Sequence, residues 1–313
     1  MPSVLENPMP LESTLAGELA SCVSPATVIR CGEPLAAHTT LRVGGPAEVF
    51  VEPASEADLA AIVKFCAARR RPFFILGRGS NLLVRDGGVR GVVISLSAAA
   101  FNGISPVGEQ LHCGAGARLK QVALEAKRRG LAGLEFMEGI PGTVGGALRM
   151  NAGAMGSWTF DVVASLRFMD HAGEIHERAR QEVPVEYRAC PLLKSHIALG
   201  AVFQGRPGSR AEIEQCMKRY SEKRWASQPA APSAGCIFKN PETIPAGRLV
   251  DELGLKGLRV GGAVVSAEHG NFIINDGGAT ARDVLALMAL VQDRALAGRR
   301  LTLQPEVEII GED

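Results

Sequence analysis

The sequence has almost no net charge and few aromatic side chains. It contains 34 Lys and Arg against 33 Asp and Glu in 313 residues, and only two Trp and two Tyr. Nucleic-acid binding through bulk charge needs a clear basic surplus, so we expect no nucleic-acid partner. Any anionic ligand must instead be met by local groups. Hydrophobic residues at 46% and charged residues at 21% are ordinary for a globular chain and exclude intrinsic disorder.

Long apolar runs and paired cysteines are also missing. The longest apolar helical run, residues 284–291, is far shorter than the ~20 residues of a membrane span. No Lys or Arg precedes Arg30, so the basic start of a signal peptide is lacking. Seven cysteines without a CxxC pair do not suit a disulfide framework, and the six histidines show no metal-ligand spacing. We expect a cytoplasmic protein with no membrane contact and no metal, and we take a monomer as the starting assumption.

Hydrophobic periodicity predicts an α+β fold. Helices are predicted where apolar side chains recur every three or four positions, over residues 117–129 and after Ser55, Ser209 and Thr280, which are expected to cap their helices because an acidic residue follows each of them three positions later. Short strands are predicted at residues 47–52, 73–76, 91–96, 271–275 and 307–310, and the strand over residues 73–76 is expected to be buried. Cys66 and Cys216 fall on apolar helix faces and should be buried. No strict strand–helix–strand repeat is present, so we do not expect a doubly wound parallel sheet.

The length predicts more than one domain. A chain of 313 residues exceeds the ~100–200 residues of a typical domain. The first thirty residues show no clear pattern, and residues 205–208 (GRPG) form a natural boundary. We predict an N-terminal extension over residues 1–30 and a body over 31–205 with parts at about 31–100 and 101–205. A C-terminal domain follows over residues 206–313.

Glycine is the residue in excess, and it gathers in two loops. The 36 glycines exceed the usual ~7% of a protein sequence. The first glycine loop, residues 77–82 (GRGSNL), directly follows a predicted strand, and the second glycine loop is residues 139–146 (GIPGTVGG). Neither matches a Walker or a Rossmann motif. Each could be a tight turn, but two such loops in one half of the chain favour a diphosphate ligand that carries a planar ring, because glycine lets backbone amides converge on an anion.

These loops belong to a longer ordered series of motifs. The series comprises residues 40–47 (TLRVGGPA), 76–83 (LGRGSNLL), 139–147 (GIPGTVGGA), 150–154 (MNAGA), 187–188 (YR), 232–241 (PSAGCIFKNP), 246–250 (AGRLV), 261–266 (GGAVVS) and 305–307 (PEV). Together they resemble the UDP-N-acetylenolpyruvoylglucosamine reductase family over about residues 36–311. The resemblance implies an FAD-binding body of the vanillyl-alcohol-oxidase type in two subdomains, followed by a C-terminal α+β substrate-binding domain.

The resemblance also implies ligands and the residues that hold them. It implies non-covalent FAD, NADPH as hydride donor and a UDP-sugar substrate in peptidoglycan precursor synthesis. The FAD contacts fall on Arg42, Gly77, Arg78, Gly79, Ser80, Asn81, Leu82, Gly139, Ile140, Pro141, Gly142, Thr143, Gly145, Gly146, Asn151, Ala152 and Gly153. The substrate contacts fall on Tyr187, Arg224, Gly235, Lys239 and Asn240.

Three residues would carry the implied reduction of an enolpyruvyl ether. Hydride goes to the terminal carbon of the ether and a proton to the adjacent carbon, so the enolate between these steps needs a fixed cation and an acid. Arg188 matches the stabilising arginine, and Glu306 matches the second stabiliser or acid. Cys236 occupies the position where the commoner family pattern has a serine as proton donor. Taken alone, Arg188 could be an exposed arginine at a strand end, Glu306 a solvated glutamate and Cys236 an inert loop cysteine.

Two other functions stay open at this stage. Only nine residues separate Arg188 from the next strand, so the chain resembles the shorter family type, which lacks a loop whose tyrosine covers the substrate. An FAD-dependent oxidase of the same superfamily would share both glycine loops, but has no reason to contain the Cys236 motif. The chain could also be a flavin or UDP-sugar binding protein without turnover, in which case Cys236 would be a sign of lost catalysis.

Overall fold

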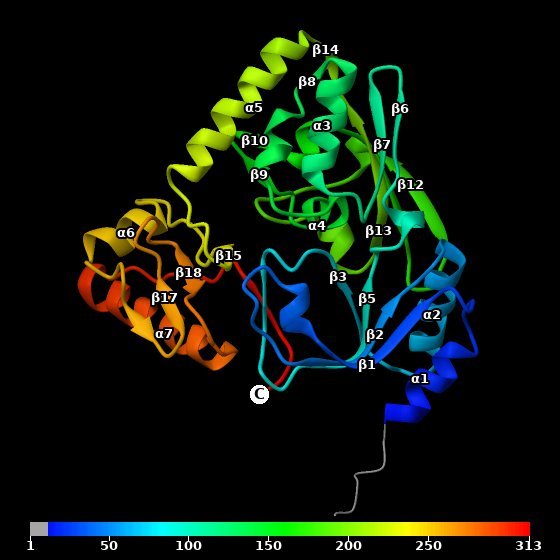
Figure 1. Ribbon diagram of the computed structural model, residues 1–313, viewed down its shortest axis with the longest axis horizontal. Helices are drawn as coiled ribbons and strands as arrows, with labels where there is room; N and C mark the ends of the chain where they lie inside the picture. The colour runs from blue at the N-terminus through cyan, green and yellow to red at the C-terminus, as the bar shows by residue number, and fades with distance from the viewer. Residues whose placement is uncertain (1–11) are drawn as a thin grey trace, which may run out of the picture.

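The structure, a computed structural model, describes residues 12–313, which build three main sheets (Figure 1). The first sheet has the order β1 (Val28–Pro34), β2 (Pro46–Glu52), β5 (Val89–Ser95) and β3 (Phe73–Leu76). Strand β1 is antiparallel to β2, whereas β2 and β3 both run parallel to β5. Helix α2 (Glu56–Ala68) joins β2 to β3, and the Ser55 side chain accepts from the Asp58 amide at its start. The capped helix predicted after Ser55 is therefore confirmed.

The sequence pattern did not predict one helix that packs against the first sheet. Helix α1 (Glu12–Ala20) buries Leu15 and Leu19 in the same core as α2 and the first sheet. Two apolar positions four residues apart are too few to reveal a helix by periodicity, so residues 1–30 gave no clear signal. The part of the predicted extension before residue 12 lies outside the described residues.

The second sheet is antiparallel throughout. Its order is β12 (Ile175–Ala179), β11 (Val163–Met169), β13 (Ile197–Gln204), β7 (Gln110–Gly114) and β6 (Ile104–Val107). Helices α3 (Leu119–Arg129), α4 (Val144–Arg149) and α5 (Arg210–Trp225) contribute to its core. Two short pairs, β8 (Leu131–Ala132) with β14 (Arg206–Pro207) and β9 (Gly153–Ala154) with β10 (Ser157–Trp158), complete this part.

Helix α5 packs where the sequence did not place it. Ile213 and Met217 on α5 lie in the core of the second sheet, although α5 follows the boundary predicted at residue 205. Cys216 on the same helix is half-buried rather than buried, because the face that packs is centred on Ile213 and Met217. The division into residues 1–30, 31–205 and 206–313 stays a prediction.

The third sheet forms the C-terminal part. Its order is β15 (Ser233–Cys236), β18 (Phe272–Asn275), β17 (Ala263–Val265) and β16 (Arg259–Val260), and helices α6 (Ala246–Glu252) and α7 (Ala281–Arg299) pack with it. The capping box predicted at Thr280 and Asp283 is present at the start of α7. The amides of Ala281 and Arg282 donate to the Asp86 carboxylate at 2.8 and 2.9 Å. These bonds join the start of α7 to the loop that precedes β5 in the first sheet.

A last strand near the C-terminus pairs beside the first glycine loop. Strand β19 (Glu308–Ile310) leaves the C-terminal part and pairs in parallel with β4 (Leu82–Val84), which directly follows the first glycine loop (Figure 1). The mixed strand and helix content agrees with the predicted α+β class. No helix among the described residues combines the length and the hydropathy of a membrane span.

Candidate active site

All three sheets border one cleft of about 1900 Å³. This volume exceeds the ~300–1000 Å³ of a typical small-molecule pocket, so the cleft has room for more than one ligand. Its charged lining is Arg42, Arg70, Arg71, Arg78, Arg118, Arg149, Arg188, Lys194 and Arg224 against Glu52, Glu306 and Glu308. A chain of net charge +1 thus concentrates cations in its cleft, which favours anionic ligands there.

The first glycine loop presents free backbone donors to this cleft. Within residues 12–313, the four consecutive amides of residues 78–81 donate to no protein acceptor, and all four residues line the cleft. Gly79 has φ +62°, and a Cβ on it would lie 2.5 Å from the His38 carbonyl oxygen. A run of unpaired amides in a glycine-rich loop that lines a cleft suits the binding of an anion, so this loop fits the diphosphate of a dinucleotide.

The second glycine loop closes the cleft in a different way. The amides of Val144 and Gly145 donate to the carbonyls of Ala117 and Ala115 at 2.9 and 2.8 Å, so these two donors are used within the protein. A Cβ built on Gly77 would lie 3.1 Å from Thr143 Oγ1, which shows that the two loops face each other closely. The first glycine loop therefore offers unpaired amides to a ligand, whereas the second glycine loop packs closely against the first.

Arg188 is presented by a tight turn. The backbone of Glu186 and Ala189 exchanges two hydrogen bonds, of 2.9 and 3.2 Å, around the central pair Tyr187 and Arg188. Arg188 has φ +56°, a strained conformation for a residue with a side chain. Its guanidinium lies 5.2 Å from the Trp158 ring and 5.4 Å from the Tyr187 ring, so two aromatic faces hold it in place.

Asn151 holds that turn rather than lining the cleft. Its Nδ2 donates to the Glu186 carbonyl at 3.2 Å, and its Oδ1 accepts from the Phe160 amide at 3.2 Å. The side chain is buried, and the residue is absent from the cleft lining. Trp158 and Asn151 thus support Arg188 from behind. Sequence reasoning did not single out Trp158, because a lone Trp carries no spacing signal.

Arg188 and Glu306 form an ion pair at the base of the cleft. Arg188 Nε donates to Glu306 Oε1 at 2.7 Å, and the two side chains are only 22% and 9% exposed. The Asn81 side chain donates to the Glu306 carbonyl at 3.1 Å, which joins the first glycine loop to this pair. Two positions further along, Glu308 pairs with Arg149, which also lines the cleft. That second pair was not predicted.

Cys236 lies beside this ion pair at the end of β15. Burial, reinforced by the negative charge of Glu306, raises the pKa of the Cys236 thiol to about 11, although Arg188 acts in the opposite direction. The thiol therefore stays protonated across the neutral range, which suits a proton donor. A thiol with this pKa is a weak nucleophile at pH 7, because the thiolate is the reactive form.

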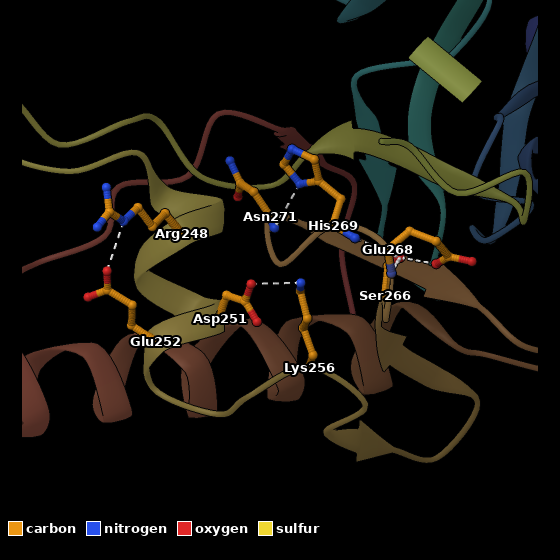
Figure 2. Close-up of polar contacts among 8 residues, drawn as sticks. All are labelled: Arg248, Asp251, Glu252, Lys256, Ser266, Glu268, His269 and Asn271. Carbon is orange, nitrogen blue, oxygen red and sulfur yellow. Dashed lines mark hydrogen bonds and ion pairs between the residues drawn. The ribbon is translucent and has the colours of Figure 1, made fainter. Parts of the chain in front are cut away.

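Asn271 fixes the backbone next to Cys236. Its side chain accepts from the Phe238 amide at 2.9 Å and donates to the Phe238 carbonyl at 2.8 Å, and its own carbonyl accepts from Ile237. Figure 2 shows Asn271 beside His269, whose Nδ1 accepts from the Asn271 amide. Ser266 supports the same turn from a fully buried position. Only the folded sheet reveals this clamp, because residues 238 and 271 are far apart in sequence.

Most of the predicted site residues gather in the cleft. The lining contains Arg188, Cys236, Glu306, Arg224, Gly235, and every predicted FAD contact except Asn151. Tyr187 lies outside the lining, with its ring against Trp158 at 5.6 Å. Lys239 and Asn240 are exposed and also lie outside it; the Asn240 Oδ1 accepts from the Ala246 amide at the start of α6. Within residues 12–313, no group of three or more His, Cys, Asp or Glu could hold a metal ion.

Comparison with known proteins identifies the chain. Residues 47–178 match the model of an FAD binding domain, and residues 228–310 match the C-terminal domain of UDP-N-acetylenolpyruvoylglucosamine reductase. The reductase of Geobacter metallireducens is 46% identical over 90% of this chain and 93% of its own length. The reductase of Pelobacter propionicus is 44% identical over 90% of this chain and 95% of its own length.

A solved structure agrees with these sequences. The crystal structure of UDP-N-acetylenolpyruvylglucosamine reductase from Thermus caldophilus aligns with a TM-score of 0.78 and 38% identity, covering 90% of this chain and 98% of that one. The predicted α+β fold with an FAD-binding body and a C-terminal domain of this family is confirmed. From the geometry of the cleft and these likenesses together, the chain belongs to the UDP-N-acetylenolpyruvoylglucosamine reductase family.

Proposed function

We propose that this chain reduces UDP-N-acetylglucosamine enolpyruvate to UDP-N-acetylmuramate, in the synthesis of peptidoglycan precursors. One observation carries the proposal: Cys236 lies beside the Arg188–Glu306 ion pair in the cleft that the first glycine loop also borders. An acid, a cation and an anion cradle are the parts that this reduction needs. A binding protein without turnover has no need of a buried proton donor next to an ion pair.

The cleft residues have distinct tasks in this reaction. The first glycine loop would hold FAD, whose chemistry when bound is the carrying of hydride between NADPH and the substrate. Arg188 uses Nε for Glu306, which leaves its two Nη groups as donors for the substrate carboxylate and the developing enolate. Glu306 keeps the guanidinium aimed at that position. Cys236 Sγ gives its proton to the carbon next to the carboxylate, and its raised pKa keeps the proton available across the neutral range.

Two assays on the same purified protein separate the three candidate functions. Purified holoprotein is mixed with NADPH, with and without the enolpyruvyl substrate, and NADPH absorbance is followed. Oxidation of NADPH that depends on the substrate supports the reductase. Oxygen consumption with an alcohol would instead support an oxidase. A yellow protein that is inert in both assays would support a binding protein without turnover.

Replacing Gly79 by valine should remove most of the FAD. A Cβ there would lie 2.5 Å from the His38 carbonyl oxygen, and valine would have to adopt a backbone φ of +62°. The loop therefore has to move, and its amides shift away from the positions in which they would bind the diphosphate. We expect the flavin content to fall to about a tenth of wild type, as read from the flavin-to-protein absorbance ratio. Gly145→Val should act similarly, since its Cβ would approach Ala115 within 3.1 Å.

Gly103→Val is the matched control for both variants. A Cβ at Gly103 meets nothing within 4 Å, and the residue does not line the cleft. It should keep its flavin. Full flavin content in Gly79→Val and Gly145→Val would contradict the assignment of the two loops.

We further propose that the enzyme works in the cytoplasm as a monomer. The buried thiols of Cys66, Cys113 and Cys190 form no disulfide, which fits a reducing compartment. The three catalytic side chains come from a single chain, so the site does not need a second copy. Size-exclusion chromatography with light scattering at micromolar protein tests the oligomeric state, and a dimer mass would contradict it.

A further inference from the structure

The C-terminal end of α5 exposes a tryptophan to the cleft. Trp225 is 59% exposed and lines the cleft, and it is one of only two tryptophans in the chain. An aromatic side chain this large normally buries most of its surface. Its helix is held firmly, because Ile213 and Met217 are buried in the core of the second sheet. The ring is thus presented on a rigid support instead of a loose loop.

The neighbours of Trp225 suit a nucleoside diphosphate. Arg224 Cζ lies 5.4 Å from the Trp225 ring, and Arg224 Nε donates to Gln228 Oε1 at 3.2 Å. Burial lowers the pKa of Arg224, and no carboxylate in residues 12–313 forms an ion pair with it. A half-buried cation without an ion pair, next to an exposed aromatic face, offers one group for a diphosphate and one for a base.

The position of Trp225 fits one end of the proposed substrate. Residues 226–232 lead from α5 directly to β15, which carries Cys236, and residues 228–232 of this segment border the cleft. Figure 1 shows the lower end of α5 next to the third sheet. A substrate whose enolpyruvyl group lies at Cys236 can therefore extend along this segment. Its nucleotide end would then reach Arg224 and Trp225. The first glycine loop, which fits the FAD diphosphate, lies on a different segment of the lining.

We propose that Trp225 is the stacking platform for the uracil ring of the UDP-sugar, with the diphosphate beside Arg224. This inference rests on the proposed function and names a specificity-determining residue for it. Stacking needs the aromatic face and not the indole nitrogen, so phenylalanine should substitute while alanine should not. Cys236 and the ion pair are untouched by such changes. The effect should therefore appear in KM for the substrate and leave kcat nearly unchanged.

The test titrates the flavin-loaded protein with UDP by calorimetry. We expect Trp225→Ala to raise the Kd for UDP about tenfold and the KM for the enolpyruvyl substrate by a similar factor. Trp225→Phe should stay within about threefold of wild type. The matched control is Leu296→Ala, which shortens another exposed apolar side chain, 54% exposed on α7 and outside the cleft. Its Kd should not change. The KM for NADPH should change less than twofold in every variant.

Each result decides the matter. An unchanged Kd for UDP in Trp225→Ala would overturn the platform while leaving the reductase function intact. A loss confined to NADPH would overturn the assignment to uracil and place an adenine ring on Trp225 instead. An equal loss for NADPH and UDP would overturn the claim that Trp225 determines specificity for the UDP-sugar. Wild-type protein that reacts with NADPH but binds no UDP would overturn the proposed function itself. Retained flavin and wild-type kcat in Trp225→Ala would show that the variant is folded.

Discussion

Replacing Cys236 by alanine should leave the reduction of the bound flavin by NADPH at the wild-type rate and slow its reoxidation by the enolpyruvyl substrate. We expect a loss of about 10²–10⁴ in the second half-reaction, the range for removing a general acid. Hydride transfer produces an enolate, and without a proton this transfer reverses. Stopped-flow absorbance of the flavin in a single turnover separates the two steps. Reoxidation at the wild-type rate would show that another group delivers the proton.

Two companion variants test the chemistry of the thiol. Cys236→Ser should remain active, because a hydroxyl at this position is also a protonated donor at neutral pH. The raised pKa of about 11 predicts slow alkylation of the wild-type enzyme at pH 7, with a rate that climbs about tenfold per pH unit below that pKa. Substrate should protect, and Cys236→Ser should resist. The control is Cys22→Ala, an exposed thiol outside the cleft, which should behave as wild type.

Removing either member of the Arg188–Glu306 pair should also affect mainly the second half-reaction. Arg188→Ala takes away the donors that meet charge formed only after hydride transfer, so we expect a loss of about 10²–10³ in substrate reduction. Glu306→Ala frees the guanidinium from the 2.7 Å contact and leaves a half-buried cation without a partner, so its loss should be similar in kind. Arg188→Lys keeps the charge but not the planar fork, and should fall between these and wild type.

The pair Arg248–Glu252 provides the control for these variants. It is joined at 2.8 Å on the surface of α6, outside the cleft, with the arginine side chain 72% exposed (Figure 2). Exposed pairs of this kind contribute little, so Arg248→Ala should leave both half-reactions within about twofold of wild type. Equal slowing of flavin reduction and flavin reoxidation in Arg188→Ala would contradict the role given to Arg188.

Local signals in the sequence predicted local structure well. The caps at Ser55 and Thr280 set the starts of α2 and α7, because a side-chain oxygen and an amide three residues later determine a helix start without reference to the rest of the chain. Ser209 shows the limit, since α5 begins there without a side-chain cap. The strand over residues 73–76 was expected to be buried, yet it forms the edge of its sheet and lines the cleft.

The motifs predicted most of the residues that meet in the cleft, but not what each one does there. Whether an amide in a glycine loop is free depends on carbonyls elsewhere, as Ala115 shows by accepting from Gly145. Asn151 lies in a motif of the FAD-binding body, yet its hydrogen bonds hold the turn that presents Arg188. Such roles arise from contacts between segments far apart in the chain, and these contacts cannot be inferred from a single sequence.

The pairing of β19 with β4 can form only after almost the whole chain has been translated, because the two strands come from distant parts of the sequence. The Asn81 side chain and the Glu306 carbonyl lie 225 positions apart, so during synthesis the first glycine loop is complete long before its partner strand exists. Closing so long a loop is slow, and domains fold as units while the chain is being made. A chain interrupted near residue 300 would carry the first glycine loop and Cys236 but not Glu306. The last residues to be translated therefore bring both Glu306 and β19 to the first glycine loop, and they join this loop to the C-terminal part.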